Sequence, residues 1–210
     1  MIARAFTEFT ILRLKKPAVA VALLVAAFAS LAAHPHVWID GFVEVRVDDS
    51  RIAAVRAHWT FDPFFSEMIV LDFGPVSNGT FTDRQIEAIR RNAFDNLRHY
   101  SYFTSLEING RKIPVEQVER FRASITEEGF LRYSFDIPIN ASLSGQSTTV
   151  RIAMYDESYF TDIVFERNYA RVLTEGIAPR RYRKRLLSEQ HIIPVWGPVT
   201  REVVEIVFEN

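Results

Sequence analysis

The stretch "HVWIDGFVEVRVDDSRIAAVRAHWTF", His36 to Phe61, holds two runs in which apolar and polar residues alternate around a short polar turn. The apolar residues of the first run carry odd numbers from Val37 to Val47, and those of the second run from Ala53 to Phe61. Successive side chains of a strand point to opposite faces of a sheet. The pattern therefore predicts a β-hairpin whose odd-numbered side chains face the core.

The shared odd numbering of the two runs also predicts how the strands pair. A one-residue slip would turn one strand's apolar side chains away from the core. A three-residue loop, Asp48-Asp49-Ser50, keeps both apolar sets on one face. The predicted opposite pairs are Val47 with Arg51, Asp40 with His58, and His36 with Asp62.

The non-core face of this hairpin is rich in groups that bind metals. Imidazole and carboxylate groups are ligands for borderline divalent ions such as Zn²⁺. A His-x-His sequence on a strand can direct two imidazoles at one ion, so His34 and His36 are the expected primary ligands. The side chains expected to complete or support this site are His58, Asp62 and Asp40.

Each supporting residue also has a structural interpretation. Asp62 precedes Pro63 and is a good helix N-cap, and His58 beside Trp59 is equally suited to a structural role. Asp40 is about 13 Å from His36 along a straight strand. It is therefore expected to orient His58, or to bind the ion itself where Gly41 introduces a bulge.

The residues before the hairpin resemble a secretory signal. Arg4, Arg13, Lys15 and Lys16 precede an uncharged apolar run, Pro17 to Ala29. This run is shorter than the roughly 20 residues that a spanning helix needs. We expect a signal peptide over residues 1–32 and a periplasmic protein from residue 33. Cleavage after Ala29 also fits, and an uncleaved N-terminal anchor is the alternative.

Composition narrows the class of protein. Four of the 25 basic residues and one of the 26 acidic residues lie in the signal segment, so the remainder carries a formal charge of −4. This balance gives no indication of nucleic-acid binding. The chain has no cysteine, which excludes disulfides and thiolate metal sites. With 17 phenylalanines, it can bury a large aromatic core.

The rest of the chain predicts an α+β fold. A short helix is expected from Asp62 to Gly74, and a longer one over 82–103, where Thr82 and Gln85 have capping-box spacing. Short strands with turns such as Asn109-Gly110 follow. We expect a single domain over 33–210. It would comprise a hairpin plus helices (33–102), followed by a mostly antiparallel, β-sandwich-like lobe (103–210).

Two further stretches are candidate sites. "MYDESYFTD" contains three acidic residues that are second-tier metal ligands or a solvated hairpin end: Asp156, Glu157 and Asp162. "PRRYRKR", Pro179 to Arg185, is a basic patch that is either a solvated loop or a dock for a membrane or partner. Its basic residues are Arg180, Arg181, Arg183, Lys184 and Arg185.

The motifs together resemble an uncharacterised bacterial family of periplasmic proteins, often labelled the periplasmic component of an ABC-type transport system. Its "HPHxWxD" block is "HPHVWID" here, and its later blocks are "WTFDPFFS" and "YDESYF". The resemblance spans nearly all of the mature chain. It implies an association with nickel/cobalt-type inner-membrane permeases and with zinc handling.

These observations predict a periplasmic Zn²⁺-binding protein, with Ni²⁺ or Co²⁺ as near alternatives, that acts with an inner-membrane metal permease. No small organic substrate is expected. Cu²⁺ is a rival ion, because cleavage at Ala32 would leave an Ala33-His34 terminus. An enzyme is not expected, since the chain has no H-E-x-x-H or G-x-S-x-G motif. The remaining rival is a non-metal accessory subunit of a transport complex.

Overall fold

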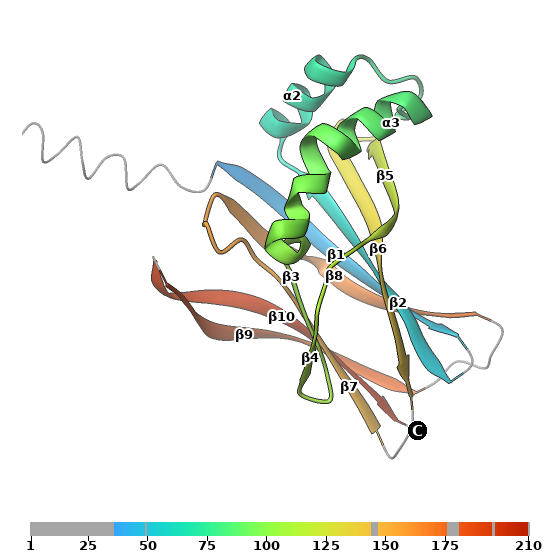
Figure 1. Cartoon of the computed structure of the whole chain (residues 1–210), viewed down its shortest axis with the longest axis vertical. Coiled ribbons are helices and arrows are strands. Elements are labelled where there is room, and N and C mark those ends of the chain that lie inside the picture. The colour runs from blue at the N-terminus through green and yellow to red at the C-terminus, as the bar shows by residue number, and fades with distance from the viewer. Residues whose placement is uncertain (1–35, 49, 144–146, 176–180, 195, 210) are drawn as a thin grey trace, which may run out of the picture. The chain divides into compact units, whose positions relative to one another are not determined.

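The computed structural model describes residues 36–48, 50–143, 147–175, 181–194 and 196–209. The expected signal peptide, His34 and Arg180 lie outside these residues. The described chain is mostly β, with two α-helices and two five-stranded sheets (Figure 1). In this part of the chain, no helix is both long enough and apolar enough to cross a membrane.

The first sheet combines strands from both halves of the sequence. Its order is β5-β6-β2-β1-β8, in which β1 and β8 are parallel and the other neighbours are antiparallel. The predicted hairpin is therefore the centre of a larger sheet and not a separate lobe. The strands are β1 (Val37–Asp48), β2 (Arg51–Phe61), β5 (Glu119–Ile125), β6 (Leu131–Ser142) and β8 (Thr161–Glu175).

The second sheet has the order β4-β3-β7-β10-β9 and is antiparallel throughout. Asn109 and Gly110 join β3 to β4 as predicted, and both have positive φ angles, as tight hairpin turns require. Buried side chains of both sheets belong to one hydrophobic core. The strands are β3 (Thr104–Ile108), β4 (Arg111–Ile113), β7 (Ser147–Met154), β9 (Tyr182–Ile193) and β10 (Gly197–Glu209).

The hairpin buries the odd-numbered side chains of β1, and those of β2 from Val55 on, but at the start of β2 it buries Ile52 and Ala54 in place of Ala53. The predicted register was also wrong. Asp48 pairs with Arg51, so the loop is one residue shorter than expected, and the register shifts again between Arg46 and Val47. An ion pair of 2.9 Å between Arg51 and Asp48 stabilises the tighter turn. As a result, the opposite pairs are Asp40 with Thr60, and Phe42 with His58.

The two helices begin as the sequence predicts. Helix α2 (Pro63–Phe73) is capped by Asp62, whose Oδ1 accepts a hydrogen bond of 3.0 Å from the Phe65 N–H. Helix α3 (Asp83–Ile89) begins with the capping box of Thr82 and Gln85. Figure 1 shows both helices at one end of the first sheet.

The second helix does not continue as an α-helix to residue 103. It widens into a π-helical turn, η1 (Arg90–Phe94), and then tightens into a 3₁₀ helix, η2 (Asp95–Phe103). A π turn adds a residue to the helical repeat and so changes which side chains face inward. Here it accompanies the burial of Phe94, whose ring lies 4.3 Å from Phe121 and 5.0 Å from Phe135.

Charged side chains on the outer face of the first sheet form a buried network. The carboxylate of Asp136 is 1% exposed and binds three arginines, including Arg46 at 3.1 Å and Arg56 at 2.5 Å. The third is Arg120, whose Nε donates at 2.6 Å. Burial opposes ionisation, but the hydrogen bonds from Arg56 and Arg120 outweigh it and lower the pKa of Asp136.

We expect Asp136→Asn to lower the free energy of unfolding by about 3 kcal/mol, because it leaves the clustered arginines without their shared carboxylate. Urea denaturation would measure the change. The control Asp48→Asn breaks an exposed pair with Arg51 and should cost less than about 1 kcal/mol. Equal effects of the two substitutions would show that the Asp136 cluster adds nothing beyond a surface ion pair.

Candidate functional site

The start of β1 lies between the end of β2 and the start of β8. The His36 N–H donates to the Phe160 carbonyl at 2.8 Å, and the two rings lie 4.9 Å apart. Two residues further on, the Trp38 N–H donates to Asp62 Oδ2 at 3.0 Å. On its other side Trp38 is in register with Asp162 of β8. Trp38 is therefore flanked by two carboxylates.

His36 lies two residues before Trp38 and directly before β1, so it is a diagonal neighbour of both carboxylates and is not opposite either one. Each oxygen of Asp62 accepts one backbone hydrogen bond, from Phe65 or from Trp38, and keeps lone pairs for a further partner. The N-cap role and a ligand role are thus compatible.

The described residues contain no group of three or more His, Asp or Glu side chains arranged to hold a metal ion. His34, the other expected primary ligand, is outside the part of the chain that the structure describes. The described part thus contributes one imidazole and two nearby carboxylates. A closed site would need His34 and movement of these side chains.

His58 lies away from this edge. It is opposite Phe42, and six residues of strand, or about 20 Å, separate that position from His36. One ion cannot bind both histidines. The His58 Nε2 is instead 3.3 Å from Glu44 Oε2, and burial lowers the pKa of His58 despite the opposing effect of Glu44. Glu44 also pairs with Arg171.

Asp40 does not lie opposite His58 as predicted, and the carboxylate that contacts His58 is Glu44. The neighbours of Asp40 are Thr60 on β2 and Val164 on β8. Glu166 lies close enough for Asp40 to affect its ionisation. Burial raises the pKa of Glu166, and the negative charge of Asp40 raises it further. No sequence motif marks Glu166.

The three acidic residues of "MYDESYFTD" have different roles. Asp156 is buried and accepts hydrogen bonds from Ser158 Oγ and from the Thr161 N–H, so it fixes the loop before β8. Glu157 lines a separate pocket. Of the three, Asp162 lies at the edge beside Trp38.

The described part of the basic patch is largely a strand. Tyr182 to Ile193 form β9, which pairs with β10 along its length. Arg183 bonds to Glu209 at 3.1 Å, and Arg185 pairs with Glu205. Lys184 donates to the Ala170 carbonyl at 2.5 Å, and Arg181 is exposed. Most of the patch's charge is therefore used within the fold.

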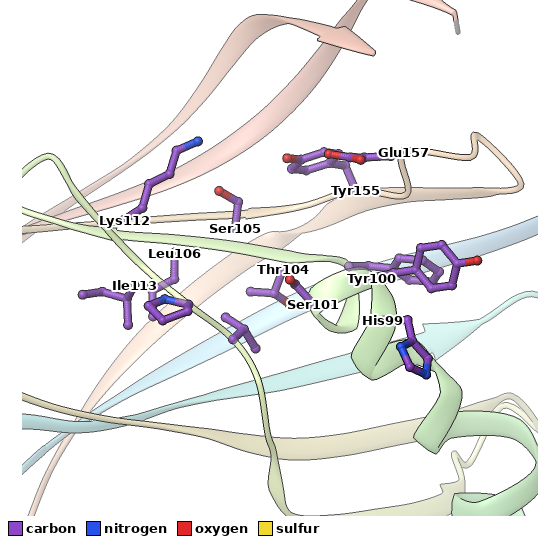
Figure 2. A pocket seen from close by; sticks show the side chains of 13 residues that line it. His99, Tyr100, Ser101, Thr104, Ser105, Leu106, Lys112, Ile113, Tyr155 and Glu157 are labelled. Carbon is purple, nitrogen blue, oxygen red and sulfur yellow. The ribbon is translucent and has the colours of Figure 1, made fainter. Parts of the chain in front are cut away.

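A pocket that the sequence did not reveal lies beside the end of η2. Its volume is about 430 Å³, within the usual range for small-molecule sites. Figure 2 shows His99 and Tyr100 on the helical segment, and Tyr155 and Glu157 after β7. Lys112 carries a positive charge on another wall. The lining thus mixes aromatic rings with both signs of charge.

Strained backbone lines this pocket. Ser101, Tyr102 and Phe103 have φ angles of 51°, 49° and 50°, in the left-handed region that non-glycine residues rarely occupy. Hydrogen bonds hold the turn, from Thr104 Oγ1 to the Tyr102 carbonyl at 2.8 Å and from the Tyr155 N–H to the Phe103 carbonyl at 2.8 Å. The segment lacks glycine, so no local sequence signal marks it.

The fold and the candidate site define a mostly β protein with a histidine and two carboxylates at one edge of its first sheet. The chain belongs to the family described as "Protein of unknown function (DUF1007)", which matches residues 19–190.

Two individual proteins are also similar to this chain. An uncharacterised 15.5 kDa protein from Spirochaeta aurantia is 34% identical over 100 residues, covering 48% of this chain and 70% of that protein. The solved structure of Capitella teleta AChBP in complex with lobeline covers 90% of this chain and 95% of its own, with 7% identity and a TM-score of 0.39.

We expect Ser101→Gly to raise the free energy of unfolding by about 0.5–1 kcal/mol. Left-handed backbone costs a non-glycine residue about 1–2 kcal/mol, and glycine's greater freedom in the unfolded chain returns part of this. Ser134→Gly, within β6, is the matched control and should destabilise by about 0.5–1 kcal/mol. Denaturant titration of both variants would measure these changes. If Ser101→Gly lowers the free energy of unfolding, the left-handed backbone at Ser101 is not strained.

We expect His58 to make the protein less stable as the pH falls below about 6.5. The unfolded histidine gains a proton there, whereas the lowered pKa keeps the folded ring neutral until a lower pH. The stability loss between about pH 7 and 5 should therefore be smaller in His58→Gln than in wild type. Denaturation across this range would measure it, with the exposed His99→Gln as the control. If the free energy of unfolding falls with decreasing pH as steeply in His58→Gln as in wild type, the burial of His58 does not cause this pH dependence.

Proposed function

We propose that this protein binds a divalent metal ion, Zn²⁺ or a near neighbour such as Ni²⁺ or Co²⁺, at the sheet edge where β1 begins. His34 and His36 are the primary ligands, and Asp62 and Asp162 complete the site. The observation that supports this most directly is that Trp38, two residues after His36, has a carboxylate as its neighbour on each side, Asp62 after β2 and Asp162 on β8. Asp162, expected earlier only as a second-tier ligand, takes the place assigned to His58.

The chemistry of the donors favours a borderline ion. Two imidazoles and one or two carboxylates form the type of set that Zn²⁺ accepts at about 2.0–2.2 Å. The paired carboxylates also concentrate cations near the edge. Imidazole must be neutral to bind, so the affinity falls as the pH drops through about 6.5.

The proposal extends to the protein's place in the cell. The signal-like N-terminal segment, with its basic start and its apolar run, supports export to the periplasm. There the protein would pass its metal to, or receive it from, an inner-membrane permease. A site at the start of the first described strand suits exchange with a partner. We also infer that the two sheets form a sandwich, since both contribute to one core.

Calorimetric titration of the metal-free protein with Zn²⁺, Ni²⁺ and Cu²⁺ would test the site. We expect tight binding that the double variant His34→Ala/His36→Ala abolishes. His99→Ala/His191→Ala removes two other histidines and should bind as wild type does. Wild-type affinity in the His34/His36 variant, or no binding by either protein, would refute the proposed function.

The two carboxylates can be tested one at a time. Asp62→Asn keeps a good helix cap but removes the charge and one of the two backbone acceptors, so its thermal midpoint is measured as well. Asp162→Asn removes the charge on β8. We expect each to weaken Zn²⁺ binding by about tenfold or more. The isosteric change Asp48→Asn, at the hairpin turn, is the control. Undiminished affinity in both variants would restrict the site to the histidines.

A further inference from the structure

Helix α2 is apolar on two opposite faces. Its inner face packs Phe65, Ile69 and Phe73 against the core. Its outer face presents Phe64 and Leu71, which are 75% and 76% exposed, together with Met68 at 39%. These three positions have the i, i+4, i+7 spacing of a single helical stripe.

A stripe of this kind is unusual on a helix at a protein surface. Surface helices usually carry polar residues opposite their buried face, and helices that are apolar all round are normally covered. With 11 residues, α2 is about 16 Å long and too short to cross a bilayer. Its outer face can therefore be covered only by a membrane surface or by another protein.

The charges around the stripe indicate what covers it. On a helical projection, Glu67 lies on one side of the stripe and Asp72 on the other, and both are exposed. The sequence has no lysine or arginine from Ala57 to Asp83. The surface is therefore apolar with acidic borders. Anionic lipid headgroups would be repelled by these borders, whereas cationic side chains would be attracted.

The helix is held rigidly enough to act as a platform. Ser66 Oγ donates to the Asp62 carbonyl at 2.7 Å and accepts from the Leu131 N–H of β6 at 2.8 Å. At the other end, Gln85 Nε2 donates to the Phe73 carbonyl at 2.9 Å. A fixed helix loses little conformational entropy when a partner docks on it.

We propose that the outer face of α2 is a docking surface for a basic amphipathic helix of a partner protein. The partner's apolar side chains cover Phe64, Met68 and Leu71, and its lysines or arginines lie over Glu67 and Asp72. This is the helix-against-helix mode of recognition, with charge fixing the choice of partner. The surface needs no metal, so it does not depend on the proposed function.

A fluorescently labelled 18-residue helical peptide of leucine and lysine is the probe, and the same peptide with glutamate in place of lysine is its counterpart. Fluorescence anisotropy with the purified protein would give the dissociation constants. Phe64→Ser/Leu71→Ser removes the apolar stripe, and Ile192→Ser, a 74% exposed residue on β9, is its control. Glu67→Lys/Asp72→Lys reverses the borders, and Glu116→Lys/Glu127→Lys reverses two other exposed acids.

The wild type should bind the lysine peptide in preference to the glutamate peptide. Phe64→Ser/Leu71→Ser and Glu67→Lys/Asp72→Lys should each weaken this binding by about tenfold or more. The two control variants should bind the lysine peptide as the wild type does. Matching thermal midpoints would show that the variants are folded. Wild-type binding by either test variant, or no binding by the wild type, would overturn the proposal.

Two further results would assign the surface to a different occupant and so also overturn the proposal. One is wild-type binding to phosphatidylcholine vesicles that Phe64→Ser/Leu71→Ser abolishes, which would make the occupant a membrane. The other is a wild-type dimer, seen by light scattering, that the same variant converts to a monomer. That result would make the occupant a second copy of this chain.

Discussion

The packing around Trp59 is the constraint on which the rest of the structure depends. Its indole is 1% exposed, lies 4.9 Å from the ring of Phe135 on β6, and stacks at 5.9 Å on Phe103. Its Nε1 donates to Met154 of the second sheet at 3.1 Å. One side chain thus joins both sheets and the end of η2. The left-handed turn at Ser101 to Phe103 brings Phe103 into this cluster, so aromatic burial offsets the local strain.

A second constraint is electrostatic. The buried carboxylates of Glu44 and Asp136 must be paired, and they occupy Arg171, Arg56 and their neighbours on the outer face of the first sheet. The second sheet uses the same principle, with Arg185 paired to Glu205. Many charged residues that a sequence analysis would assign to partners are therefore part of the structure. The acidic borders of α2 differ, because no basic residue lies near them in sequence.

Asp62 connects the regions to which we assign function. It ends β2, accepts a hydrogen bond from the Trp38 backbone and caps α2. The proposed metal site and the proposed docking helix thus share one residue, which fixes the position of both. A carboxylate has several lone pairs, so the N-cap role that the sequence predicted for Asp62 does not exclude a ligand role.

The sequence by itself determined the local features: the alternation of β1 and β2, the caps at Asp62 and Thr82, and the turn at Asn109-Gly110. Each depends on residues close together in the chain. The predicted pairing of His36 with Asp62 was wrong by two residues, because Trp38 lies opposite Asp62. Only the tertiary structure decided the hairpin register, the strand pairing of "RYRKR" and the position of Asp162 beside Trp38. The register depends on a bulge within the hairpin, and the pairing of β9 depends on which of several strands it meets. Trp38 and Asp162 are more than a hundred residues apart in the sequence, so no local pattern records that they are neighbours.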